Sequence, residues 1–106
     1  MAQIAQQDFQ ASLFNLAIEH AAKSNVNFSS GAQALLRDFI DKGVKRMPDA
    51  KQSNLDLAES NLIKIIDLIV EEVHRRNRTY SANAQIILEQ RTFSDIQGRL
   101  GRFWPF

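Results

Sequence analysis

Apolar side chains recur every three or four residues along most of this chain, and this spacing constrains the fold more than any other feature of the sequence. It gathers apolar side chains on one face of an α-helix, whereas a half-buried strand would alternate at every second residue. Only four glycines and two prolines interrupt the pattern, and no sustained strand-like alternation or internal repeat is present. We therefore predict an all-α fold, a compact bundle of four to five helices.

Capping signals and helix breakers divide the pattern into segments. Ser30 and Gln33 have the spacing of a capping box, in which each side chain bonds a free backbone amide, so a helix is predicted from Ser30 to about Arg46. Pro48 ends this helix, because proline disfavours helical geometry in the residue before it. Further helices are expected over residues 3–23 and 55–77, from residue 79 or 81 to about 90, and after residue 92. The helix that ends at about residue 90 is expected to bury Ala84, Ile87 and Leu88.

The long helix predicted over residues 55–77 carries a wide apolar arc. Ile63 and Leu68 flank its main stripe, one on each side. A helix packed against a single neighbour needs a narrower arc. We therefore expect this helix to be central in the bundle, or Ile63 and Leu68 to face a second subunit. The main stripe itself consists of Leu55, Ala58, Leu62, Ile65, Ile66, Ile69, Val70 and Val73.

Length and composition exclude several classes of protein. The 106 residues suit one domain with a modest core. The chain has no cysteine, which excludes disulfides and cysteine-ligated zinc, and its net charge of +1 lacks the strong basic excess of a general nucleic-acid binder. Residues 1–8 contain no basic or long apolar run, and charged residues break the longest apolar stretch. We expect no signal peptide, no membrane span and a cytoplasmic location.

The two histidines are the candidates for catalysis or metal binding. Glu71 and His74 form a Glu-x-x-His pair, the unit of di-iron helical bundles, but that chemistry needs a second pair and two more glutamates. This pair shares a face with Asp67 and Arg78, opposite the apolar stripe, which favours a solvated role. His20 lies within the apolar stripe of the first helix, where we expect it to bond a backbone carbonyl. No catalytic motif is present, so we predict no enzyme activity, no metal and no cofactor.

The densest basic cluster follows at the end of the same long helix. Arg75, Arg76 and Arg78 could contact the phosphates of a nucleic acid. Basic residues also end the first two predicted helices, at Lys23 and Arg46, and cations in these positions complement the helix dipole without any ligand. Helix stabilisation is the preferred interpretation, and phosphate contact is the alternative.

Residues 93–106 are rich in apolar and aromatic side chains. Phe93, Ile96, Leu100 and Trp104 share one helical face, and Phe103 borders it. We expect these residues to form a short amphipathic helix, or an aromatic tail, packed on a helical bundle domain of residues 1–92. Two glycines in the segment each cost a helix about 1 kcal/mol relative to alanine, which favours a tail that docks on a partner.

Gln97, Leu100, Phe103 and Trp104 resemble the box with which replication and repair proteins dock on the ring-shaped sliding clamp. The pattern of that family is a glutamine, an aliphatic residue three positions on, and then two aromatic residues. The resemblance implies that the aliphatic residue and an aromatic one form a plug on one helical turn, while the glutamine bonds a backbone site. Short patterns also arise by chance, so packing within the fold or in a homodimer is the preferred interpretation.

Residues 30–91 are similar to a histone fold in the order of their predicted elements. A medium helix and a long helix are followed by Arg78 and Thr79, which lead into a short helix. In histone folds an arginine–threonine pair often occupies the second loop, and two chains interlock through the long helix. The similarity implies a dimer formed along the long helix.

Taken together, these features predict a small, non-enzymatic adaptor or regulatory protein that self-associates through helical contacts. It is expected to need neither a membrane nor a small-molecule substrate. One alternative is a nucleic-acid-associated replication or repair accessory protein that uses the basic cluster and the docking box. The other is a small helical metal-dependent enzyme. The predicted interface residues are Ile63, Leu68, Leu100, Phe103, Trp104 and Phe106.

Overall fold

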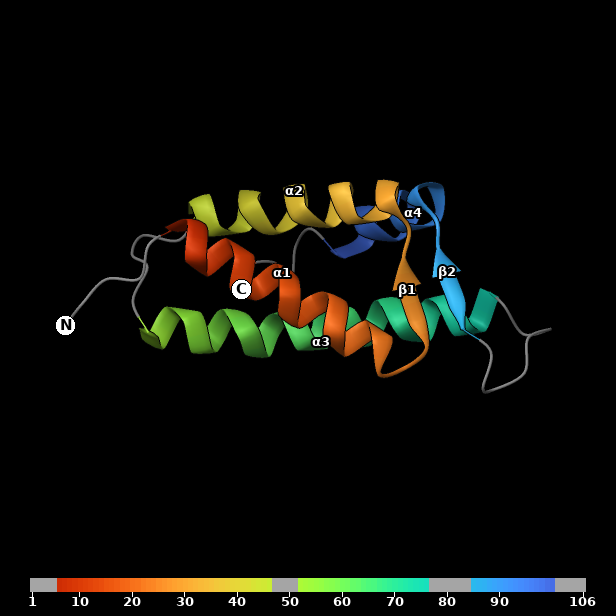
Figure 1. The fold of residues 1–106 in the computed structure, drawn as a ribbon, viewed down its shortest axis with the longest axis horizontal. Coiled ribbons are helices and arrows are strands. Elements are labelled where there is room, and N and C mark those ends of the chain that lie inside the picture. The colour runs from red at the N-terminus through yellow and green to blue at the C-terminus, as the bar shows by residue number, and fades with distance from the viewer. Residues whose placement is uncertain (1–5, 47–51, 77–84, 101–106) are drawn as a thin grey trace.

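Four helices and two short strands make up the part of the chain that the computed structural model describes, residues 6–46, 52–76 and 85–100 (Figure 1). The prediction of an all-α fold is confirmed for these residues, and the two strands add a feature that the sequence pattern did not indicate. In chain order the elements are α1 (Gln6–Ala22), β1 (Val26–Phe28), α2 (Ser30–Arg46), α3 (Gln52–Arg76), β2 (Ile86–Leu88) and α4 (Gln90–Leu100).

The order helix–strand–helix occurs twice along the chain. The first half is α1–β1–α2 and the second is α3–β2–α4. The strands of the two halves pair in parallel. A helix follows each strand almost at once, so α2 and α4 leave the sheet together and pack against each other. The paired residues are Val26 with Ile86, Asn27 with Ile87, and Phe28 with Leu88.

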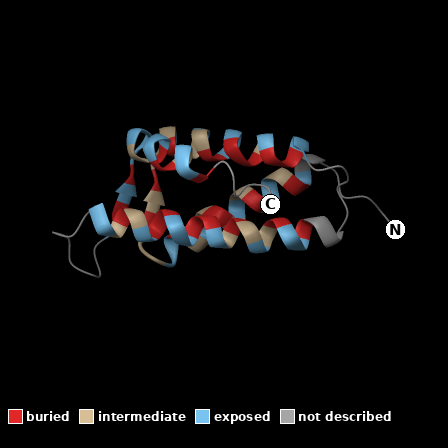
Figure 2. Ribbon diagram, turned by 180° about the vertical axis from the view of Figure 1, so that it is seen from behind, coloured by how far each residue is buried: buried red, intermediate tan, exposed pale blue. Residues whose placement is uncertain are grey.

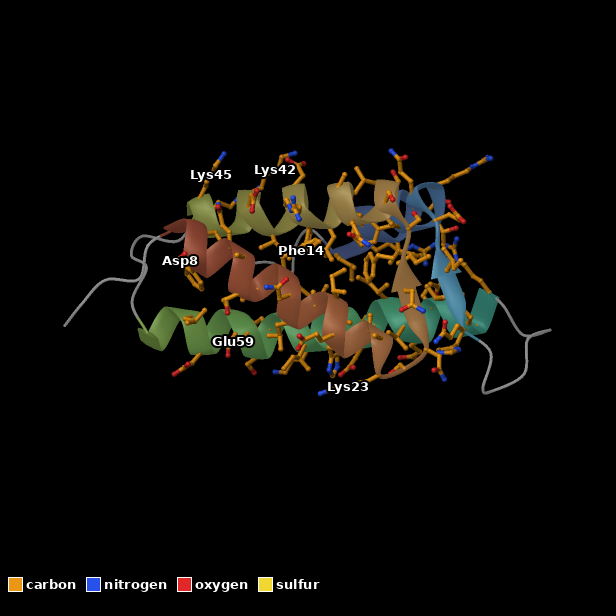
Figure 3. The ribbon with its side chains drawn as sticks, in the orientation of Figure 1. Asp8, Phe14, Lys23, Lys42, Lys45 and Glu59 are labelled. Carbon is orange, nitrogen blue, oxygen red and sulfur yellow. The ribbon has the colours of Figure 1, made fainter. Side chains whose placement is uncertain are left out.

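The helices enclose one apolar core. α2 and α3 run along opposite sides of the bundle, α1 packs against both on one face, and α4 packs against both on the other (Figure 1). Buried residues face inward from all four helices (Figure 2), and no polar or charged side chain within the described ranges is buried. Lys23, Lys42 and Lys45 point away from the bundle (Figure 3). The core thus excludes charge throughout the described part of the chain.

α3 buries the whole stripe predicted for it, because all eight of those apolar residues lie in the core. With 25 residues it is the longest of the described helices. It packs against α1 and α4 and exposes its opposite side, so it lies along an edge of the bundle rather than at its centre. This exposed side is available for contact with another molecule.

The residue that caps the start of α2 lies one position before the predicted one. Asn25 lies in the turn between α1 and β1 and adopts the left-handed region, with φ 64°, which asparagine adopts more readily than most residues. Ser29, not Ser30, accepts a hydrogen bond from the amide of Ala32 at 3.2 Å, and the Gln33 side chain donates to the Phe28 carbonyl at 3.0 Å. The cap shifts because Phe28 is held in the sheet and helix formation begins directly after it.

The predicted short helix that ends at about residue 90 is wrong for residues 86–88, which form β2. Ile87 was expected in its core but is 63% exposed, because alternate residues of a strand point to opposite faces. Ile86 and Leu88 face the core instead. Two β-branched residues and pairing with β1 outweigh a helical spacing that was too short to be decisive.

Candidate interaction surfaces

Two large apolar side chains stand on the exposed face of α3. Leu57 is 49% exposed and Leu68 is 45% exposed. They are eleven positions apart, close to three full helical turns, so they share one face of the helix. Asn61 and Lys64 occupy the same face between them. We call this row of four residues, Leu57, Asn61, Lys64 and Leu68, the outer α3 face.

The other predicted interface residue of α3 is placed differently. Ile63 is half-buried at the border of the core, so it contributes less surface to a contact than Leu68 does. Leu57 was not predicted, although its spacing from Leu68 could have identified it. Ile87, also missed, is exposed on the outer side of the sheet beside Asn27.

The basic cluster is partly neutralised by neighbouring carboxylates. Arg75 and Arg76 both form ion pairs with Glu72, and the distance from Arg76 Nε to the Glu72 carboxylate is 3.0 Å. Arg76 Nη1 also lies 3.9 Å from the Asp95 carboxylate on α4. Arg78 lies outside the described residues. These carboxylates offset part of the positive charge that a phosphate would meet, so the geometry gives phosphate contact less support than the sequence alone did.

The docking box is divided between the core and the surface. Leu100 is only 4% exposed and packs in the core with Phe93 and Ile96. Gln97 is half-buried on the neighbouring side of α4. The remaining predicted residues, Phe103, Trp104 and Phe106, lie outside the described residues. Docking through the box would require Leu100 to leave the core.

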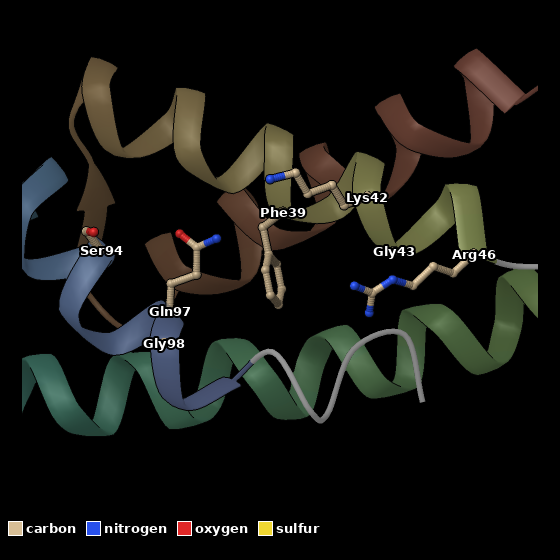
Figure 4. A pocket seen from close by; sticks show the side chains of 7 residues that line it. All are labelled: Phe39, Lys42, Gly43, Arg46, Ser94, Gln97 and Gly98. Carbon is tan, nitrogen blue, oxygen red and sulfur yellow. The ribbon is translucent and has the colours of Figure 1, made fainter.

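An open groove of about 430 Å³ lies between the second half of α2 and the last turns of α4 (Figure 4). Phe39 forms its apolar floor and is itself 7% exposed. Two glycines leave parts of both walls without side chains, and Arg46 lines the groove together with Lys42, which is paired with Asp38 at 3.0 Å. Among the described residues it is lined by Phe39, Lys42, Gly43, Arg46, Ser94, Gln97 and Gly98, and we call it the α2–α4 groove.

Both histidines attach the end of α1 to α3, in roles opposite to those predicted. His20 does not bond a backbone carbonyl; its Nε2 donates to the Asp67 carboxylate at 2.7 Å. His74 is not on a solvated face; its Nε2 donates to the Ser24 carbonyl at 2.9 Å in a partly buried position. His74 thus satisfies a carbonyl that follows the last turn of α1. Both side chains have structural partners in α1–α3 packing.

We expect His74→Ala to lower the free energy of unfolding by about 1–2 kcal/mol, because it leaves the Ser24 carbonyl without its donor. His74→Gln retains a side-chain N–H and should recover part of the loss. His20→Ala should cost less than His74→Ala, since Asp67 is largely exposed. Urea unfolding followed by circular dichroism would measure all three variants. Equal losses for both alanine variants would contradict the distinction between the two contacts.

The described residues contain no group of three or more histidine, aspartate or glutamate side chains placed to hold a metal ion. Within the same ranges, no helix has the length and apolar character needed to cross a membrane. Comparison of the chain with models of protein families, with curated proteins and with solved structures found no match. The functional argument therefore rests on the surfaces of the molecule itself.

Proposed function

We propose that this protein is a small, non-enzymatic helical module that acts through protein–protein contact and self-associates through the outer α3 face. The observation that carries the proposal is the pair Leu57 and Leu68, two half-exposed leucines on one face of the longest described helix. Burial of apolar side chains is the main favourable term in most protein association. The same face could also receive a heterologous partner.

An antiparallel pair of α3 helices would use this face symmetrically. Under a two-fold axis, Leu57 of one copy meets Leu68 of the other, and the same contact occurs a second time. The axis then passes between Asn61 and Lys64, so Asn61 of one copy faces Lys64 of the other across the interface. The similarity of residues 30–91 to a histone fold adds no support, because residues 86–88 form β2 where that similarity expects a short helix.

The contact should be weak. Only two leucines per copy are available on the outer α3 face, whereas stable dimers bury more than about 1,000 Å² with a tightly packed centre. A dissociation constant on the order of 10–100 µM is the expected range. Reversible association of this strength suits an adaptor that exchanges partners.

Sedimentation velocity over a concentration series tests the proposal. The unaltered chain should shift from monomer to dimer as its concentration rises, and Leu57→Lys with Leu68→Lys should keep it monomeric. Ile87→Lys is the matched control, because it replaces another exposed apolar residue, on β2 rather than on the outer α3 face, and should leave the equilibrium unchanged. A chain that stays monomeric throughout, or a control that dissociates the dimer equally well, would refute self-association through this face.

A further inference from the structure

We propose that a pocket between α1 and α2 binds a small zwitterion of the amino-acid class. The pocket has a volume of about 260 Å³, below the range of about 300–1,000 Å³ that is usual for drug-sized ligands, so its occupant should be small. It shares no residue with the outer α3 face, so the inference does not rest on the proposed self-association. Its lining among the described residues consists of Gln10, Ala11, Phe14, Asn15, Arg37 and Asp41, and we call it the α1–α2 pocket.

Arg37 is positioned in this pocket by an aromatic ring instead of by a carboxylate. Its Cζ lies 4.5 Å from the centre of the Phe14 ring, and Phe14 itself is half-buried at the margin of the core (Figure 3). A guanidinium that contacts a ring through its face keeps the N–H donors along its edge. That edge can bond a carboxylate through two parallel hydrogen bonds. Within the described ranges, no carboxylate pairs with Arg37, so its edge is available to a ligand.

A second pair of charges on α2 has the same spacing but a different geometry. Asp38 and Lys42 are four positions apart, and their charged groups meet at 3.0 Å. Arg37 and Asp41 are also four positions apart, yet the structure shows no ion pair between them. On a helix, a carboxylate that precedes its cation pairs better than one that follows it, and Asp41 follows Arg37. The two charges therefore remain available at the pocket, about 6 Å apart along the helix axis.

α1 contributes two primary amides to the same pocket. Gln10 is half-buried and Asn15 is exposed. Neither side chain forms a hydrogen bond with another described residue. An amide both donates and accepts, so it can bond either end of a zwitterion. Four polar side chains from two helices thus line one pocket without a hydrogen-bond partner in the described part of the chain.

The two charges of the α1–α2 pocket select the charge of its occupant. A ligand with a carboxylate alone would bond Arg37 but would also be repelled by the Asp41 carboxylate. A ligand with a cation alone would be repelled by Arg37 in the same way. An amino acid carries both charges, so it satisfies both side chains, while Ala11 and Phe14 offer apolar contact to its side chain. The sequence did not predict this ligand, because the lining residues meet only through the packing of α1 on α2.

Titration of the isotope-labelled full-length chain with L-leucine, followed by the NMR shifts of its backbone amides, tests the proposal. We expect saturable shifts at pocket residues of both helices, with a dissociation constant on the order of 1 mM for so few contacts. Arg37→Gln and Asp41→Asn should each weaken binding roughly tenfold, because each removes one charge-assisted contact. The matched controls, Lys42→Gln and Asp38→Asn, remove the same types of charge from the pair outside the pocket and should leave binding unchanged.

Two analogues of the ligand test its charges separately. N-acetyl-L-leucine lacks the ammonium group and L-leucinamide lacks the carboxylate, so each should bind roughly tenfold more weakly than L-leucine. Shifts that stay linear up to about 20 mM L-leucine would overturn the proposal. Equal binding of N-acetyl-L-leucine and L-leucine would also overturn it, because Asp41 would then have no role. Binding that is unchanged in Arg37→Gln would place the ligand at another site and overturn it as well.

Discussion

Replacing Phe93 with alanine is expected to remove about 3–5 kcal/mol from the free energy of unfolding. The side chain is 1% exposed in the core and contacts the Phe28 ring, so the change removes a large buried group together with an aromatic pair. A domain of this size is stable by only about 5–15 kcal/mol. The substitution should therefore remove a large share of the total stability, measurable by urea unfolding.

Phe14→Ala is the matched control for this prediction. Phe14 is half-buried, packs at the margin of the core and stacks under Arg37, so its removal exposes less of the interior. Its loss in the same urea experiment should be less than half that of Phe93→Ala. Comparable losses in the free energy of unfolding would show that the contact between β1 and α4 contributes no more to stability than a contact at the margin of the core.

Two glycines should respond to substitution with opposite signs. A Cβ atom at Gly31 would lie 2.6 Å from Oε1 of Gln90 and 3.0 Å from its Cβ, so Gly31→Val would displace the exposed Gln90 side chain and crowd its Cβ. We expect a loss of about 1 kcal/mol, at the lower end of the range for overpacking. Gly98→Ala meets no described atom within 4 Å and should stabilise the protein by about 0.5–1 kcal/mol through helix propensity.

Thermal and urea unfolding of both glycine variants would measure the difference. The two changes act on the same pair of helices, so a general sensitivity of α2 and α4 cannot produce opposite signs. If Gly31→Val unfolds at the same urea concentration as the unaltered chain, the close approach of Gly31 to Gln90 is not a constraint on the fold. A Gly98→Ala variant that loses stability would contradict the open space beside that residue.

The helices could be predicted because their signals are local. The α3 stripe spans nineteen residues, from Leu55 to Val73, and Ser30 and Arg46 bound α2 as expected. The strands could not be predicted, since each has only three residues and gains its stability from a partner far away in the chain. Ile87 was assigned to the wrong environment because three residues carry both a helical and a strand-like pattern.

The candidate surfaces also include features that the sequence could predict and one that it could not. Leu68 was identified because its position on a long helix fixes the face to which it points. The pairing of Arg75 and Arg76 with Glu72 was also available from spacings of three and four residues. The α2–α4 groove was not available, because Phe39 and Gly98 come together only through the packing of helices that lie far apart in sequence. Tertiary contacts of this kind produce no periodic pattern in the amino-acid sequence.

The parallel pairing of β1 and β2 has a consequence for how the chain folds. Every paired residue is separated from its partner by 60 positions, and no short hairpin can bring the strands together. Closing so long a loop before any sheet contact forms costs chain entropy, which slows folding relative to a bundle with local contacts. During synthesis, the first half would wait for the second half to leave the ribosome. We therefore expect α1–β1–α2 to lack a stable core by itself. The chain should fold only after its synthesis is complete.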